Sequence, residues 1–313
     1  MIKASLTSLA LSTLLFSQTL VAAEAVDQAQ KVAATAEVNV NVQRGNIIFR
    51  SWDKNEVAVK GQLDEVSQGL TFTVSGSNVL IEDKMPKKYN GNNQDGSQLT
   101  IMLPQKIKLQ AKGLSTNYRL NIFDGKMDIS SISGNIKAEQ LTNKVTLHTV
   151  SGDINSRALN GKILLETVSG KIKDTDSQGK MSYRSVSGDI HADSSLNKMS
   201  LETVSGYANI KLDTINKFNV KTVSGNIDLS VNNLKDKANI ESVSGDLNLH
   251  FVDNGDTSFN ISGGPSGNII NKLTQDKVSK ELYSPHTYIK FKTGDGSAHL
   301  NASTVSGNIV LSR

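Results

Sequence analysis

The sequence contains no cysteine among its 313 residues. This excludes disulfide bonds, thiolate metal sites and a lipid-modified cysteine. Aromatic residues make up 5% of the chain, and Trp52 is the single tryptophan, so stacking platforms for sugars are poorly supplied. Proline occurs four times, and long apolar segments with helical periodicity are missing. Stability must therefore come from repeated burial and backbone hydrogen bonding.

The chain also lacks a large excess of charge of either sign. It holds 34 basic and 30 acidic residues, and removal of residues 1–23 takes away only Lys3, which leaves 33 and 30. Such a small, dispersed excess predicts no nucleic-acid partner and favours a solvated surface of mixed charge.

The first residues have the pattern of a secretory signal peptide. A basic residue, Lys3, precedes a short apolar stretch, and small residues at Val21-Ala22-Ala23 come just before the first acid, Glu24. We expect cleavage after Ala23 and a periplasmic or cell-surface location. A membrane anchor is disfavoured because the apolar stretch is short and Ser17-Gln18-Thr19 interrupts it. No transmembrane segment is expected after cleavage.

A short motif recurs along the chain: a hydrophobic residue followed by Ser-Gly. The serines of seven copies step by 18, 18, 18, 18, 19 and 20 residues. A copy at 261–263 continues the series, one at 305–307 closes it after an insertion, and one at 74–76 stands apart. The regular copies are Ile132-Ser133-Gly134, Val150-Ser151-Gly152, Val168-Ser169-Gly170, Val186-Ser187-Gly188, Val204-Ser205-Gly206, Val223-Ser224-Gly225 and Val243-Ser244-Gly245.

A fixed short period predicts a solenoid in which each repeat is one coil. We expect an all-β fold, a parallel β-helix or β-solenoid with coils of about 18 residues, and about three short strands per coil. The expected solenoid domain covers residues 37–313, with irregular early coils at 37–125, regular repeats at 126–264, and an insertion with C-terminal coils at 265–313. Residues 24–36 are expected to be a linker or an N-terminal cap, such as a short helix.

The glycine of each repeat is predicted to be a structural corner. A corner can require either a positive φ or a close backbone approach to the next coil. For Gly188 we test the first of these alternatives, a corner with a positive φ. The predicted corners are Gly134, Gly152, Gly170, Gly188, Gly206, Gly225, Gly245 and Gly307.

A structural charge ladder is predicted at the position two residues before each repeated valine. Its members are Glu166, Arg184, Glu202, Lys221 and Glu241. Opposite charges on neighbouring strands favour pairing, and the alternation cancels the field that a charged ligand would need, which disfavours a charged binding stripe. Asp153, Lys171 and Asp189 alternate in the same way. Hydroxyl residues follow the charge ladder and are expected inward or at a bend, so strict alternation places the valines outward.

Two irregular segments, 83–98 and 271–287, could be recognition elements or solvated insertions. The second contains the one expected helix, at 275–282. The sequence does not decide whether either segment is functional.

The sequence predicts no catalytic residue, metal site or cofactor. The acids Asp174, Asp176 and Asp193 have no paired partner in the pattern, and the five histidines show no metal-ligand spacing. A calcium repeat is disfavoured because there is one glycine per 18 residues and Lys171 and Tyr207 interrupt the acidic column.

Several motifs together resemble the bacterial "putative adhesin" family of β-strand-repeat proteins, a family of unknown function. They are Ser51-Trp52-Asp53-Lys54-Asn55-Glu56-Val57, Leu99-Thr100-Ile101-Met102-Leu103-Pro104, the repeated Thr-Val-Ser-Gly-Asp-Ile units, and Thr304-Val305-Ser306-Gly307-Asn308-Ile309. The resemblance covers residues 37–313. It implies a right-handed β-helix in exported or envelope-associated proteins, and it supplies no catalytic residue.

These observations favour a non-enzymatic solenoid of the cell envelope that presents an elongated surface to a protein or glycan partner. One alternative is a polysaccharide-active β-helix enzyme, which needs carboxylates about 5–10 Å apart in a groove. Another is a periplasmic regulatory or stress-response partner. The ligand and the oligomeric state are not predicted.

Overall fold

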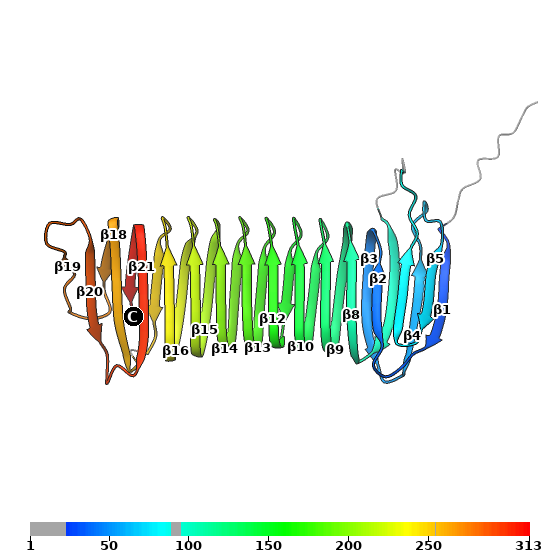
Figure 1. Cartoon of the computed structure of the whole chain (residues 1–313), viewed down its shortest axis with the longest axis horizontal. Helices are drawn as coiled ribbons and strands as arrows, with labels where there is room; N and C mark the ends of the chain where they lie inside the picture. Colours follow the sequence, from blue (N-terminus) through cyan, green and yellow to red (C-terminus); the bar gives the residue numbers. More distant parts are fainter. Residues whose placement is uncertain (1–22, 89–94, 254) are drawn as a thin grey trace, which may run out of the picture.

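The computed structural model describes residues 23–88, 95–253 and 255–313. These ranges form 21 hydrogen-bonded strands wound into coils that lie side by side along a rod (Figure 1). The predicted all-β solenoid is confirmed. The described ranges contain no helix, and hence no helix that could span a membrane. The predicted signal peptide lies outside the described residues except for Ala23.

The regular coils stack in parallel with the period of the sequence repeat. Ile136, Ile154, Ile172 and Ile190 are successive partners, each 18 residues after the last. The strands of this region are β8 (Lys106–Gly113), β9 (Ser115–Ser131), β10 (Ile136–Thr149), β11 (Ile154–Arg157), β12 (Asn160–Thr167), β13 (Ile172–Ser185), β14 (Ile190–Thr203), β15 (Tyr207–Thr222), β16 (Asn226–Ser242) and β17 (Leu247–Phe251).

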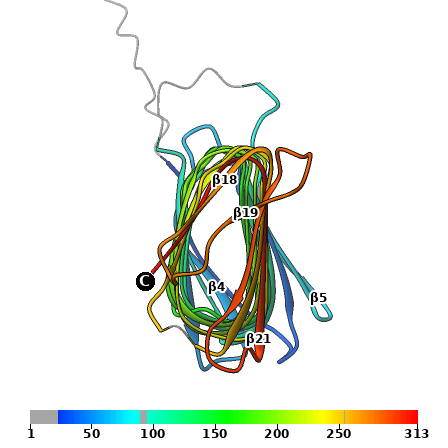
Figure 2. The ribbon, with the colours of Figure 1, turned by 90° about the vertical axis from the view of Figure 1, so that its left-hand side faces the viewer.

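Each coil is flattened and has two long faces, so the oval outline in Figure 2 encloses a narrow core. β11 and β12 form the two faces of one coil, and they pair with the first and second halves of β13. The prediction of about three strand segments per coil was therefore one too many. Inward residues such as Ile172 on one face and Leu165 on the other are buried, because alternate side chains of a strand point to opposite sides.

The longer coils take up their extra residues on the side opposite the Ser-Gly turns. Register shifts occur between Ser194 and Lys198 and again between Ile215 and Lys217. After each shift the strands return to register before the next Ser-Gly motif. Insertions of one residue therefore leave the repeated motif aligned along the rod.

The first coil of the chain lies inside the rod, one coil in from its N-terminal end. β3 pairs with β7 on one side and with β9 on the other, and β2 pairs likewise with β6 and β8. The strands here are β1 (Ala25–Lys31), β2 (Glu37–Asn41), β3 (Arg44–Trp52), β4 (Glu56–Gln62), β5 (Leu70–Ser75), β6 (Asn78–Asp83) and β7 (Ser97–Pro104).

Residues 24–36 contain a strand rather than the linker or short helix that their Ala and Gln content suggested. β1 pairs antiparallel with β4 from Ala25 with Gln62 to Lys31 with Glu56. Val26 is buried in this arrangement. Pairing with an open strand edge outweighs the weak helix preference of a short segment. β1 therefore covers an edge at the end of the rod.

The last coil of the chain is also placed one position in from its end. β21 (Ala298–Ser312) pairs with β16 and β17 on one side and with β18 (Thr257–Asn271) on the other (Figure 1). The expectation that the copy at 261–263 continues the series is therefore wrong, because β18 does not pair with β16 or β17. Val305-Ser306-Gly307 follows Val243-Ser244-Gly245. In the coil beyond it, Ser266 and Gly267 pair with Ser306 and Gly307, so the copy at 261–263 does not occupy the repeat position.

The C-terminal end is closed by β19 (Ser279–Lys280) and β20 (Thr287–Lys292), which run antiparallel to each other, with β20 antiparallel to β18. The helix expected at 275–282 is absent, and its last residues include β19. A segment of eight residues without a packed apolar face is too short to be stable as a helix.

Candidate functional site

The hydroxyl residue before each repeated valine caps the Ser-Gly turn from inside the coil. In six turns the Ser or Thr Oγ atom accepts a hydrogen bond from the glycine N–H three residues later, at 2.8–3.1 Å. These hydroxyl groups are buried. The valine that follows therefore points away from the core. The capping residues are Ser131, Thr149, Thr167, Ser185, Thr222 and Ser242.

The repeated glycines allow close contact between the backbones of successive turns. A Cβ atom added at any of the eight predicted corners would lie 1.8–2.8 Å from a carbonyl oxygen of the preceding coil. For Gly188 that oxygen belongs to Gly170, at 1.8 Å. Gly188 has no positive φ, so the positive-φ expectation was wrong for this residue. Only Gly206 and Gly307 among these corners have a positive φ, of 110° and 101°.

Those two corners belong to a second type of turn. Thr203 and Thr304 donate their hydroxyl hydrogen to the carbonyl groups of Ser205 and Ser306, instead of accepting from the glycine N–H. The peptide group between the serine and the glycine is turned over relative to the other turns, so that its carbonyl group faces the threonine. The glycine takes a positive φ, which residues other than glycine rarely adopt. The repeated motif therefore supports two turn geometries.

The acidic and amide residues after the glycines bind the backbone of the next coil. Asn135 Oδ1 accepts from the Asp153 N–H at 2.7 Å, and Asp153 Oδ1 accepts from the Lys171 N–H at 2.8 Å. Asp246 Oδ1 accepts from the Asn308 N–H in the same way, at 2.8 Å. This structural use accounts for the Asp and Asn column without calcium.

The repeated valines form an exposed aliphatic ladder along one edge of the flattened coils. Val168 is 37% exposed and Val305 is 53% exposed, with most of the others between these values. Exposed apolar side chains that gather on one part of a protein surface often mark an interaction site. The ladder consists of Leu114, Ile132, Val150, Val168, Val186, Val204, Val223, Val243 and Val305.

The predicted charge ladder runs parallel to the aliphatic ladder. Glu166, Arg184, Glu202, Lys221 and Glu241 are direct partners in successive coils. Arg184 Nε lies 3.1 Å from Glu202 Oε2, and Lys221 Nζ lies 3.3 Å from Glu241 Oε2. Because these ion pairs are exposed, each contributes about 0–1 kcal/mol to stability.

A groove of about 710 Å³ lies between the two ladders and extends over six coils. Its walls are the charge ladder and the valines from Val168 to Val243, with the hydroxyl column between them, and Ser303 of β21 lines it at one end. No aromatic residue lines it. The groove can therefore hold an extended chain through aliphatic contacts and paired charges, but it cannot stack a sugar ring on an aromatic face.

The acids considered for catalysis are not gathered in this groove. Asp174 is fully buried in the core, where its carboxylate accepts hydrogen bonds from Ser156, Ser177, Tyr183 and Ser194 at 2.6–3.0 Å. Burial raises its pKa in spite of these four donors. Asp176 lies at a bend with a φ of 58°, and Asp193 is exposed on the face opposite the groove.

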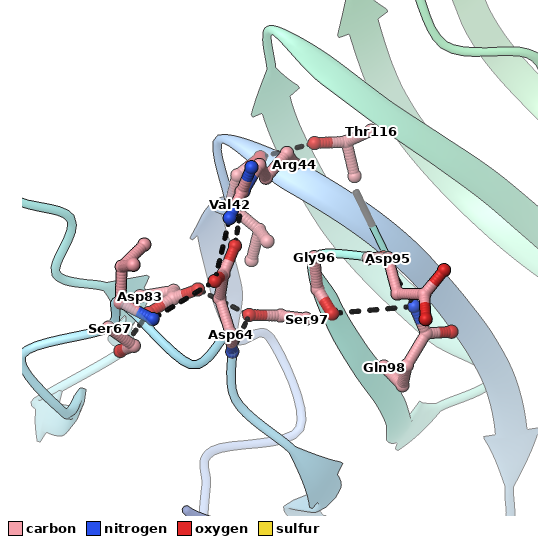
Figure 3. Close-up of polar contacts among 11 residues, drawn as sticks. Val42, Arg44, Asp64, Ser67, Asp83, Asp95, Gly96, Ser97, Gln98 and Thr116 are labelled. Atoms are coloured by element: carbon pink, nitrogen blue, oxygen red, sulfur yellow. Dashed lines mark hydrogen bonds and ion pairs between the residues drawn. The ribbon is translucent and has the colours of Figure 1, made fainter. Parts of the chain in front are cut away.

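The polar stretch 83–98 is anchored by a second buried cluster (Figure 3). Asp83 accepts hydrogen bonds from the Ser67 and Ser97 hydroxyls, each at 2.5 Å, and the Asp64 N–H donates to Ser97 Oγ at 2.8 Å. Arg44 pairs with both carboxylate oxygens of Asp64. Burial opposes ionisation of Asp64, but the bonds from Arg44 and the Val66 N–H outweigh it and hold its pKa below the usual value.

These contacts give both acids structural roles: Asp83 lies at one end of the polar stretch, and Asp64 binds Ser97 near the other end. Residues 89–94 lie outside the described residues. Within the described ranges, no group of three or more His, Asp or Glu side chains is arranged to hold a metal ion.

The sequence placed the charge ladder in register but did not identify the groove beside it. The available signal was the strict alternation through Leu165, Glu166, Thr167 and Val168, which places the valine on the same side as the charge.

A sequence model described as Toastrack DUF4097 matches residues 35–312. No curated protein matches the chain. A solved structure described as a putative adhesin from Bacteroides fragilis is 14% identical over 92% of this chain and 97% of its own, with a TM-score of 0.36. A putative cell adhesion protein from Clostridium sporogenes is 12% identical over 92% and 99%, with a TM-score of 0.22.

Proposed function

Because the chain belongs to the Toastrack DUF4097 family, a repeat family of unknown function, we propose its role from its own surface: it is a non-enzymatic, adhesion-type scaffold of the cell envelope. In this proposal the groove between the aliphatic and charge ladders binds an extended segment of a partner protein. The observation that carries the proposal is the exposure of aliphatic side chains at equivalent positions in successive coils.

The contacts of the repeat support an interaction role for the valines. The hydroxyl residue caps the turn, and the glycine permits the close approach of the next coil. The repeated serine donates a hydrogen bond to the carbonyl group of the valine in the preceding coil, as Ser187 Oγ does to Val168 at 3.3 Å. The serine and the aliphatic side chain both face solvent, but the serine hydroxyl is engaged in a hydrogen bond between coils, and the aliphatic side chain has no such role in the turn.

A polypeptide partner fits the groove better than a glycan. The alternating charges can pair with side chains of both signs on an extended segment, and its apolar side chains can pack against the valines. A glycan would need stacking surfaces or many free hydrogen-bonding groups, and no aromatic residue lines the groove.

The groove is also poorly suited to glycoside hydrolysis. That reaction needs one carboxyl group held protonated and a second one ionised. Arg184 and Lys221 each lie between two glutamates of the ladder, so no two carboxyl groups of the ladder are direct partners in neighbouring coils. Turnover of an envelope polysaccharide by the purified protein would overturn this part of the proposal.

The partner interaction can be tested by placing a photoreactive residue at Val204, in the groove, and in a separate protein at Asp193, on the opposite face. Both side chains are exposed, so both substitutions leave the core intact. We expect illumination of cells to give a defined protein adduct from position 204 alone. Equal labelling from both positions, or none from position 204, would contradict the proposal.

The envelope location rests on the signal-peptide pattern of residues 1–23. Protease treatment of intact cells tests where the chain resides. Cleavage with the envelope intact indicates the cell surface, and cleavage only after permeabilisation indicates the periplasm. A chain found in the cytoplasm with residues 1–23 retained would exclude an envelope role.

A further inference from the structure

The C-terminal end of the rod carries an apolar turn that projects from the solenoid. Residues 281–286 connect β19 to β20 in the outermost layer, beyond the stack of regular coils (Figures 1 and 2). Leu282 is 80% exposed and Tyr283 is 99% exposed, which makes them the most exposed large hydrophobic residues in the described ranges. Neither side chain contributes to the core.

The turn is held in one conformation by its own hydrogen bonds. The Glu281 N–H donates to the His286 carbonyl at 3.0 Å, and the Ser284 N–H donates back to the Glu281 carbonyl at 3.3 Å. The His286 N–H donates to Ser284 Oγ at 3.2 Å, and the Glu281 carboxylate lies 3.5 Å from His286 Nδ1. The apolar tip is therefore presented by an ordered turn.

Tyr283 adopts a strained backbone conformation at this tip. Its φ is 59°, in the left-handed region that a residue other than glycine, Asn or Asp seldom occupies. Strain of this kind persists where the surrounding structure imposes it and is a recognised feature of binding sites. Here it directs an aromatic side chain into solvent.

The excess positive charge of the protein is concentrated in the same end of the rod. Residues 24–256 contain 27 basic and 27 acidic side chains, whereas residues 257–313 contain six basic and three acidic ones. Lys280 of β19 and Lys290 and Lys292 of β20 are exposed in the layer that carries the turn. Residues 24–256 therefore carry no net charge, and the C-terminal end of the rod is basic.

We propose that this cap, the tip residues Leu282 and Tyr283 with the surrounding lysines, binds an anionic lipid surface. Tyrosine and leucine partition into the boundary between headgroups and acyl chains, and nearby lysines are attracted to anionic headgroups. A convex tip of two residues suits insertion into a bilayer, whereas a stable protein interface needs about 800 Å² from each partner. The cap acts independently of the groove.

Flotation of residues 24–313 with lipid vesicles tests the proposal. We expect binding to vesicles of phosphatidylcholine with phosphatidylglycerol, and much weaker binding to phosphatidylcholine alone. The double variant L282S/Y283S should lower binding at least about tenfold, because it removes the inserted apolar area. The variant K280A/K290A should lower binding to anionic vesicles by a similar factor and remove most of its salt dependence.

A matched control separates the cap from the groove. The variant V204S/V223S removes two exposed aliphatic residues from the groove and should bind vesicles like the wild type. A tryptophan introduced as Tyr283→Trp provides a second readout, because Trp52 lies near the opposite end of the rod. Brominated lipids should quench the fluorescence of this variant and leave that of the wild type unchanged.

Three results would overturn the proposal. One is the absence of wild-type binding to anionic vesicles. Another is wild-type binding by L282S/Y283S with an unchanged melting curve. The third is that the cap fails to bind lipid but forms a defined complex with a protein, and that the L282S/Y283S variant does not form this complex.

Discussion

Thr167 Oγ1 accepts a hydrogen bond of 3.0 Å from the N–H of Gly170, inside the turn that presents Val168 to solvent. The same contact recurs in five other turns, so in each of these coils one buried hydroxyl fixes the direction of one exposed aliphatic side chain. The capping residue and the exposed ladder are thus two consequences of the same local geometry.

Replacement of Thr167 by valine should destabilise this turn. The substitution keeps the shape of the side chain but leaves the buried Gly170 N–H without its acceptor, which costs about 1–3 kcal/mol. Thr167→Ser keeps the hydroxyl and should retain most of the stability. Urea denaturation of the three proteins measures the difference. A larger loss in Thr167→Ser than in Thr167→Val would show that the methyl group matters more than the hydrogen bond.

Gly188→Ala should be strongly destabilising for a steric reason. The added Cβ would lie 1.8 Å from the Gly170 carbonyl oxygen, so the two coils must separate locally. We expect a loss of about 1–3 kcal/mol or more. Gly76→Ala is the matched control, since Gly76 has a φ of 61° but open space around it, and it should lose only about 1–2 kcal/mol. Thermal unfolding that ranks Gly76→Ala as the more damaging change would contradict this account.

The sequence predicted the solenoid, its period and the register of the charge ladder because these follow from the 18-residue repeat. It could not choose between positive φ and close approach for Gly188, since both require glycine. The burial of Asp174 could not be predicted either, because its four hydroxyl donors come from separate places in the sequence.

The order of the terminal coils was the largest error, and it has a physical cause. Repeat spacing reports which residues are equivalent within a coil, but it does not report which coils are neighbours when the chain skips a position. The segment between β18 and β21 is long enough to return past one coil, so β21 could occupy the place that the spacing assigned to β18.

Removal of β21 should therefore release more of the chain than its own residues. A chain ending at Lys292 leaves β18 without the strand that joins it to β16 and β17. Because solenoid stability depends on contacts between neighbouring coils, we expect residues 257–292 to become sensitive to protease while residues 115–251 stay protected. Limited proteolysis with mass spectrometry measures this. Continued protection of β18 would show that it can pair directly with β16 and β17.

The buried carboxyl group of Asp174 should make stability depend on pH. Its pKa is raised in the folded protein, so the folded state holds this proton more tightly than the unfolded state does. The resulting stabilisation is complete below about pH 4 and is lost as the pH rises through the folded pKa. The free energy of unfolding of the wild type, relative to Asp174→Asn, should therefore fall as the pH increases from 4 towards neutrality. A relative stability that rises over this range would contradict the assigned shift.

The central claim is that the aliphatic ladder binds a partner, and the most direct test is the yield of the photo-adduct at position 204. The variant V186S/V223S removes the neighbouring valines in the groove, and I132S removes an equally exposed member of the same ladder outside it. The account predicts that V186S/V223S abolishes the adduct with a loss of at most about 1 kcal/mol in stability per site, whereas I132S leaves it unchanged. An adduct of wild-type yield in V186S/V223S would contradict the account.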